Sequence, residues 1–137
     1  MKNVIMILIV VAALGGAAYV MQGKLGMGEE AMSERISELQ LNARGYRTSG
    51  EYQKSIPLLE EAVELSRKYY DDAPSTALAV VMRDLATDYI RVGRYEDAIP
   101  LLEEVIHMRI EVSGNDAPET FRARRLLDEA KKGASGG

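Results

Sequence analysis

The chain has 137 residues, a net charge of −4, one histidine, and neither cysteine nor tryptophan. Without cysteine it cannot form a disulfide or a thiolate metal site. With a single histidine, it lacks the residues that most nucleophilic and metal-dependent enzymes need. The mildly acidic balance argues against nucleic-acid binding, which needs a basic surface. We therefore expect no catalytic residue, metal or cofactor in this single-domain length of chain.

The first patterned segment is apolar. Residues 3–22 carry no charged side chain, and residues 4–21 are 18 apolar or small residues with one tyrosine. About 20 apolar residues span a bilayer, with a lower limit near 17. We therefore predict that residues 1–21 form a transmembrane helix or signal-anchor, which inserts into the membrane through residues 3–21. The short tail before the apolar run favours an exported position for the rest of the chain, periplasmic in a bacterium. Lys2 on one side nearly balances Lys24 and Arg35 on the other, so the orientation stays open.

A cleaved signal peptide is the competing interpretation of the same segment. Lys2 would form the positive region, residues 4–14 the apolar region, and residues 15–18 (Gly-Gly-Ala-Ala) the small residues at a cleavage site. Retention is favoured because the apolar residues continue past this cluster to Met21. Small residues spaced by four, such as Ala12 and Gly16, would allow two such helices to pair.

The rest of the chain is predicted to be helical. Residues 22–32 hold three glycines and scattered charge, which indicates a flexible linker. Apolar side chains then recur with helical spacing, and the predicted helices are about 33–48, 51–70, 75–92, 94–112 and 119–132, followed by a disordered tail at 133–137. Ser33 is predicted to cap the first helix, and Tyr46 to belong to its apolar stripe. Pro57 would strain a helix interior, so its helix is predicted to begin at Ser55 or Ile56.

Part of the sequence occurs twice. Residues 50–63 read GEYQKSIPLLEEAV and residues 93–106 read GRYEDAIPLLEEVI, at an offset of 43. Asp-Ala-Pro at 72–74 returns at 116–118, at an offset of 44. A repeat of this period predicts an array of helical units that bury their apolar faces against one another.

These repeats resemble the tetratricopeptide repeat (TPR) family, most closely the long-loop form of about 42 residues seen in kinesin light chains. The matching positions are Ala43, Tyr46, Gly50, Tyr52, Leu59 and Ala62 in the first repeat and Leu85, Ala86, Tyr89, Gly93, Tyr95, Ala98 and Leu102 in the second. The resemblance implies an all-α fold of antiparallel helix-turn-helix units over residues 33–132, with about two TPR units and a C-terminal capping helix. Asn42 and Ser55 depart from the family's usual leucine and alanine, so the first repeat is the weaker match.

In this family the first helix of each pair lines a concave groove. That geometry implies a set of tentative partner-binding residues: Gln40, Arg44, Arg47, Arg83, Thr87, Arg91, Arg124 and Lys131. A basic groove would favour an acidic or C-terminal carboxylate-bearing protein or peptide. The plainer interpretation is that these side chains are ordinary solvated charges.

One short motif has the spacing of a metal site. Glu104 and His107 form a Glu-x-x-His unit, which carboxylate-bridged di-iron proteins use in pairs. The first repeat has glutamates at the corresponding positions but no histidine after them, so the repeat itself explains Glu104 and we expect no metal.

The sequence thus favours a membrane-anchored TPR adaptor or scaffold that binds a protein partner, without nucleic acid and without enzymatic activity. One alternative is a structural subunit of a membrane or envelope complex that forms a homo-oligomer through the repeat ends and the membrane helix. Another is an exported soluble TPR module, released by signal cleavage.

Extraction of the protein from membranes distinguishes these forms. If residues 3–21 anchor the chain, the protein should pellet with membranes and stay there in carbonate at high pH and in high salt, since neither treatment removes a helix from the bilayer. The mass of the mature protein is the control. A mature N-terminus near Tyr19 would show instead that the segment is a cleaved signal.

Overall fold

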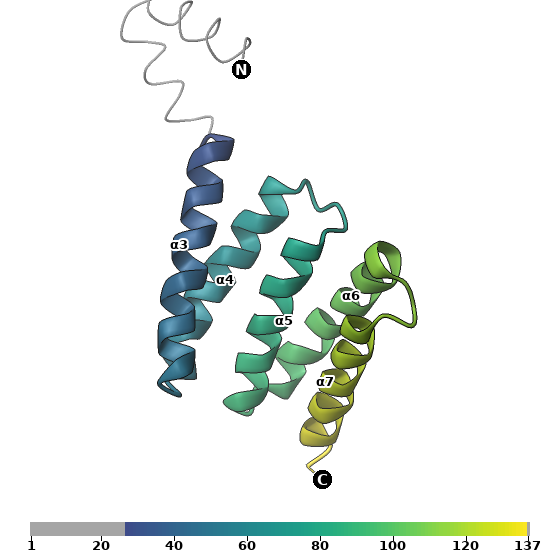
Figure 1. Cartoon of the computed structure of the whole chain (residues 1–137). Coiled ribbons are helices and arrows are strands. Elements are labelled where there is room, and N and C mark those ends of the chain that lie inside the picture. Colours follow the sequence, from purple (N-terminus) through teal and green to yellow (C-terminus); the bar gives the residue numbers. More distant parts are fainter. Residues whose placement is uncertain (1–26, 137) are drawn as a thin grey trace, which may run out of the picture. The chain divides into compact units, whose positions relative to one another are not determined.

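Five helices account for most of the residues that the structure, a computed structural model, describes (27–136). They are α3 (Glu29–Thr48), α4 (Tyr52–Tyr69), α5 (Thr76–Arg91), α6 (Tyr95–Ser113) and α7 (Pro118–Ala134). Successive helices are antiparallel, and α3, α5 and α7 form one layer in front of α4 and α6 (Figure 1). No strand occurs in residues 27–136, so the predicted all-α fold is confirmed.

The predicted transmembrane helix, residues 1–21, lies outside the described residues. Within residues 27–136, none of the helices combines the length and the apolar character needed to cross a bilayer.

Small residues mark where the two layers meet. Ala43, Ala86 and Ala130 occupy the same position in α3, α5 and α7, at the 43- and 44-residue offsets of the sequence repeat, and all three are buried. Ala62 of α4 and Ala98 of α6 are fully buried as well. A methyl side chain at these positions lets neighbouring helices approach closely, and larger apolar residues fill the space around each contact.

Two equivalent glycines end α3 and α5. Gly50 after α3 has a φ of 74°, and Gly93 after α5 has a φ of 79°. The next backbone N–H in each case donates to the carbonyl of a tyrosine five residues earlier, from Glu51 to Tyr46 and from Arg94 to Tyr89. A left-handed glycine in this position is a common helix stop, because it lacks the Cβ that would be strained there.

The start of α3 differs from the prediction. The helix begins at Glu29, so residues 29–32 of the predicted linker are helical, and Ser33 is not its cap. Ser33 lies inside the helix, where its carbonyl accepts a hydrogen bond from Ser37 Oγ. The acidic side chains of Glu29 and Glu30 provide the physical reason, because negative charge in the first turn stabilises the positive end of a helix.

The start of α4 predicted at Ser55 or Ile56 is also wrong, whereas the range of about 51–70 is correct to within one residue at its start. The helix begins at Tyr52, so Pro57 is its sixth residue and not part of the first turn; Pro100 has the same place in α6. Proline has no N–H and removes one hydrogen bond from a helix. Both prolines are exposed, which leaves the carbonyl that would have accepted that bond close to water.

The environment of Tyr46 corrects a third prediction. Tyr46 is 37% exposed, whereas its equivalent Tyr89 is 7% exposed, because α4 lies against the corresponding face of α5. There the Tyr89 hydroxyl donates to Glu60 of α4 at 2.6 Å, and the Arg94 guanidinium lies 4.4 Å from the centre of its ring. Tyr46 therefore belongs to the open end of the array and not to its core.

Replacement of Leu102 by alanine tests the repeat register. Leu102 and its counterpart Leu59 are both buried, as the repeat predicts. Leu102→Ala should lower the free energy of unfolding by about 2–5 kcal/mol, because it leaves a cavity in the core. Leu101→Ala, next to it but only partly buried, is the control and should cost less. Equal losses for the two variants in urea melts would show that the register is wrong.

Candidate functional site

A groove runs between α3 and α5 and consists of three hollows that share side chains. The first, of about 110 Å³, lies among α3, α4 and α5 near the start of α3 and includes Gln40. The second, of about 90 Å³, joins it at Gln40 and continues to Arg44 and Arg47. The third, of about 310 Å³, shares Arg44 and Arg47 and opens at the other end of α3. We call this continuous surface the α3–α5 groove.

The third hollow is basic. Its lining residues are Arg44, Arg47, Thr48, Tyr52, Thr87 and Arg91, and no acidic side chain lines it. Thr48 Oγ and Thr87 Oγ donate to carbonyls of their own helices. The guanidinium groups of Arg44 and Arg91 are exposed and make no hydrogen bond or ion pair with any residue in 27–136. This end of the groove therefore presents two positive charges that the described part of the chain does not neutralise.

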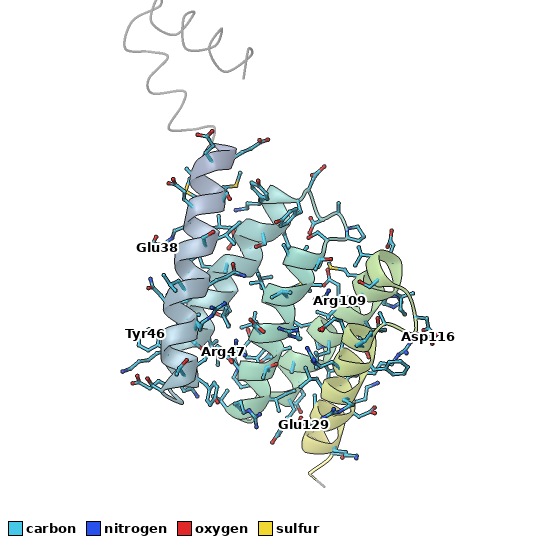
Figure 2. All side chains as sticks on the ribbon, in the orientation of Figure 1. Glu38, Tyr46, Arg47, Arg109, Asp116 and Glu129 are labelled. Atoms are coloured by element: carbon cyan, nitrogen blue, oxygen red, sulfur yellow. The ribbon has the colours of Figure 1, made fainter. Side chains whose placement is uncertain are left out.

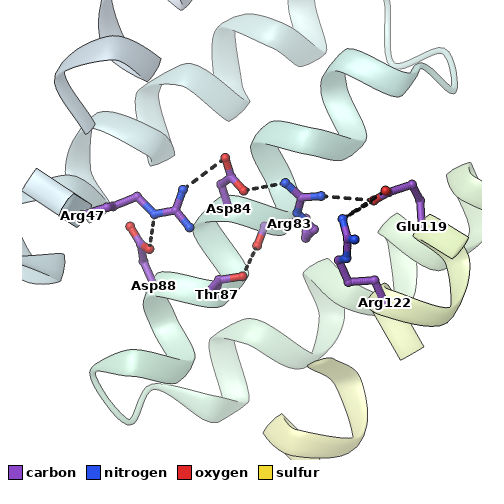
Figure 3. Close-up of polar contacts among 7 residues, drawn as sticks. All are labelled: Arg47, Arg83, Asp84, Thr87, Asp88, Glu119 and Arg122. Carbon is purple, nitrogen blue, oxygen red and sulfur yellow. Dashed lines mark hydrogen bonds and ion pairs between the residues drawn. The ribbon is translucent and has the colours of Figure 1, made fainter. Parts of the chain in front are cut away.

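Arg47, Arg83 and Arg122 belong to a chain of ion pairs that crosses the layer of α3, α5 and α7 (Figure 3). Arg47 of α3 contacts Asp84 of α5 at 3.2 Å, and Asp84 also contacts Arg83 at 3.0 Å. Arg83 reaches Glu119 of α7 at 3.3 Å, and Glu119 accepts from Arg122 at 3.0 Å. Charges of opposite sign alternate along this chain, so its arginines are largely neutralised.

One carboxylate of this cluster is completely buried. Asp88 of α5 accepts a hydrogen bond from Arg47 Nε at 2.7 Å and another from Ser55 Oγ of α4. Burial raises the pKa of the Asp88 carboxyl, while Ser55 and Arg47 act in the opposite direction. The three residues come from three different helices, so this contact fixes the position of α3 on α4 and α5 and with it the width of the groove.

The structure brings together some of the residues predicted to bind a partner. Arg44, Arg47, Thr87 and Arg91 line the basic hollow, and Gln40 lies further along the same groove.

The other predicted residues lie elsewhere. The Arg83 side chain is 21% exposed and belongs to the ion-pair chain. Arg124 donates to the carbonyl oxygen of Asn115, and Lys131 lies 3.7 Å from Glu103 of α6. Neither Arg124 nor Lys131 lines the α3–α5 groove.

Glu104 has a structural partner. Both of its carboxylate oxygens accept from Arg67 of α4, at 2.6 and 2.7 Å, and His107 is exposed. In the part of the chain that the structure describes, no three histidine or carboxylate side chains are grouped so that they could hold a metal ion.

Sequence reasoning missed Thr48 and Tyr52 as groove residues and Asp88 as a buried partner of Arg47. Thr48 follows Arg44 by one helical turn, so its place in the groove could have been read from the same helical face. The role of Asp88 had no such signal, because the equivalent residue of the first repeat is Gly45.

Comparison with known proteins identifies the repeats. The sequence model of the tetratricopeptide repeat family matches residues 35–111, which is more than half of the chain. No curated protein matches the sequence of this chain.

Truncation of Asp88 tests whether the buried contact holds the groove together. Asp88→Ala should lower the free energy of unfolding by about 3 kcal/mol, because it leaves the partly buried Arg47 without its closest partner. Asp97→Ala is the matched control. Asp97 pairs with Arg94 at the same distance of 2.7 Å, but its side chain is 51% exposed, so the loss should stay below about 1 kcal/mol. Similar losses in chemical denaturation would contradict the buried role of Asp88.

Proposed function

Because the chain belongs to the tetratricopeptide repeat family, whose repeats generally mediate protein–protein interaction, we propose that it is a membrane-anchored adaptor for an acidic protein or peptide. The anchor is residues 3–21, and the binding surface is the α3–α5 groove. We further assign the repeats to the long-loop variety, supported by the 43- and 44-residue offsets and by the loops at 70–75 and 114–117.

The observation that carries this proposal is the charge of the third hollow. Arg44 and Arg91 stand at its edge without partners among residues 27–136, and its lining includes no carboxylate. A guanidinium binds a carboxylate through two parallel hydrogen bonds, which gives both attraction and orientation. The hydroxyl groups of Thr48, Tyr52 and Thr87 add neutral polar contacts around this pair. An acidic segment of a partner would neutralise the positive charges of Arg44 and Arg91.

The anchor would place the binding of the acidic partner at the membrane. In the sequence, seven residues separate Met21 from the first residue of α3, Glu29. Such a short connection would keep the groove close to the membrane surface. The adaptor would then recruit its partner to the bilayer surface, on the exported side if the N-terminus stays in the cytoplasm.

Binding of a short acidic peptide tests the groove. Fluorescein-labelled hexaglutamate should bind the full-length protein in a non-ionic detergent, and Arg44→Glu or Arg91→Glu should weaken binding at least about tenfold, since each reverses an unpaired charge. Raising the salt from 50 to 300 mM should also weaken it, because salt screens exposed charges. Measurement is by fluorescence polarisation.

Lys132→Glu is the control, because it makes the same charge change at an exposed position of α7 outside the groove. Binding that is equally weak in all three variants would indicate only a general charge effect. Binding that none of the variants alters would reject the groove as the acidic site.

A second candidate function rests on the open end of the array. Leu41 of α3 is 67% exposed, and together with Tyr46 and Leu58 it lines a hollow of about 420 Å³ on the side of α3 away from α5. Arrays of this kind usually need about three repeats for stability, and this chain supplies two and one further helix. A structural subunit that self-assembles would cover such a face. The mass of the full-length protein in detergent distinguishes the two functions, since an adaptor with free ends is a monomer.

A further inference from the structure

The first hollow of the α3–α5 groove contains a buried hydroxyl without a hydrogen-bond partner. Ser66 of α4 is 1% exposed, and its Oγ is buried with no partner in the described residues. A hydroxyl removed from water loses the hydrogen bonds that water would supply, which is unfavourable unless another group replaces them. The Ser66 hydroxyl is therefore available to a molecule that enters the groove.

Other hydroxyls on these helices use a partner of their own helix. Ser37, Thr48 and Thr87 each donate to the backbone carbonyl four residues earlier, at 3.0, 2.9 and 2.8 Å. This bond is a common arrangement for a serine or threonine inside a helix. Ser66 lies inside α4 and does not make it, so within residues 27–136 its hydroxyl neither donates nor accepts.

The position of Ser66 in the hollow is deep. Ser66 and Val81 are buried and form the floor, whereas Ser33, Ser37 and Tyr69 are exposed and form the rim. The hollow of about 110 Å³ exceeds the roughly 30 Å³ that one water molecule occupies in the liquid. A group of about four non-hydrogen atoms would therefore fill it. We call this hollow the Ser66 pocket.

A short side chain at position 66 accounts for this space. At the 43-residue offset of the repeat, Ser66 corresponds to Arg109 of α6, which is 4% exposed (Figure 2). The second repeat thus buries a long side chain at the position where the first repeat has only a hydroxymethyl group. The serine leaves space beside α3 and α5 that a side chain of that length would occupy.

The lining of the Ser66 pocket is polar but uncharged. Its polar groups are hydroxyls and the carboxamide of Gln40, and no charged side chain of residues 27–136 lines it. An ionised group would lose its water there without meeting an opposite charge. An apolar group would leave the Ser66 hydroxyl without a hydrogen bond. The occupant that meets both conditions is neutral and carries hydrogen-bonding atoms.

We propose that the Ser66 pocket binds an asparagine side chain of the protein partner. The carbonyl oxygen of that side chain can accept from Ser66 Oγ, and its NH₂ group can donate to the carboxamide oxygen of Gln40. An asparagine side chain has about four non-hydrogen atoms, which matches the size of the pocket. The assignment rests on the proposed function, because it gives the same partner a second contact in the same groove.

The distance between the two contacts gives a spacing for the partner segment. Ser37 on the rim of the pocket and Arg44 of the basic hollow are seven residues apart in α3. Seven residues of helix correspond to about 10 Å along its axis. An extended peptide covers this distance with about three residues. The partner should therefore have an asparagine three positions from an acidic residue.

Two fluorescein-labelled peptides, one for each chain direction, test the pocket. They are Asn-Ala-Ala-Glu-Glu-Glu and Glu-Glu-Glu-Ala-Ala-Asn, each compared with the peptide that has alanine in place of asparagine. In at least one direction, the asparagine peptide should bind the full-length protein in a non-ionic detergent about fivefold more tightly, as measured by fluorescence polarisation. Equal affinities in both directions would overturn the proposal and show that the pocket holds only water.

Ser66→Ala removes only the hydroxyl. The variant should lose the preference for asparagine and bind the alanine peptides as the wild type does. Ser135→Ala is the control, because it makes the same change at an exposed hydroxyl after α7, which donates to the carbonyl of Lys132 at 2.9 Å. This control should keep the preference. A preference that survives in Ser66→Ala would rule out the Ser66 pocket as the asparagine site.

Thermal unfolding shows whether the Ser66 hydroxyl is bonded within the chain. Ser66→Ala should unfold at the same temperature as the wild type or higher, because it loses no hydrogen bond. Ser55→Ala is the contrast and should unfold at a lower temperature, since the equally buried Ser55 hydroxyl donates to Asp88. A clear fall for Ser66→Ala would reveal a partner within the chain and overturn the proposal.

Arg44→Glu separates the two proposals. If Ser66→Ala removes the asparagine preference and Arg44→Glu weakens the binding of every peptide, both proposals stand. If only Arg44→Glu acts, the basic hollow stands and the Ser66 pocket fails. If only Ser66→Ala acts, the Ser66 pocket stands and the basic hollow fails as the acidic site.

Discussion

The close contact of the helices at their alanines is the constraint on which the rest of the structure depends. Ala43, Ala86 and Ala130 of the first layer and Ala62 and Ala98 of the second are almost completely buried. No single helix pair can bury its apolar face alone, so each helix needs its neighbour at this short distance. The spacing between α3, α5 and α7 follows from these contacts, and so does the existence of a groove between their exposed faces.

That spacing also determines the electrostatics of the layer. Arg47, Asp84, Arg83, Glu119 and Arg122 form one alternating chain because α3, α5 and α7 lie side by side at a separation that their side chains can bridge. Arg44 and Arg91 lie outside this chain, at the open end of the α3–α5 groove, and their guanidinium groups make no ion pair with any described residue. Local charge differences within a mildly acidic protein thus give the proposed surface for an acidic partner.

The two repeats differ where their neighbours differ. Tyr89 is buried because α4 covers that side of α5, whereas Tyr46 and Leu41 are exposed on α3. At the position of the buried Asp88, the first repeat has Gly45, so the polar contact with Ser55 of α4 and Arg47 of α3 occurs only once. Equivalent residues of the two repeats therefore lie in different environments, because α5 is covered by α4 and the corresponding face of α3 is exposed. That exposed face of α3 is the candidate surface for self-assembly.

The sequence by itself determined the elements that depend on neighbouring residues. Helical spacing of apolar side chains gave the five helices, the repeat gave the equivalence of Leu59 with Leu102, and Gly50 and Gly93 marked the ends of α3 and α5. The misplaced starts at Ser33 and Ser55 were errors of a few residues, since helix starts depend on weak local preferences that compete with one another. Tertiary structure alone decided which arginines are paired and which are not, because Arg47 meets Asp88 across 41 positions of the chain and Arg83 meets Glu119 across 36. It also decided that Arg109 is buried, for a side chain on a helix becomes buried only when the next helix packs over it.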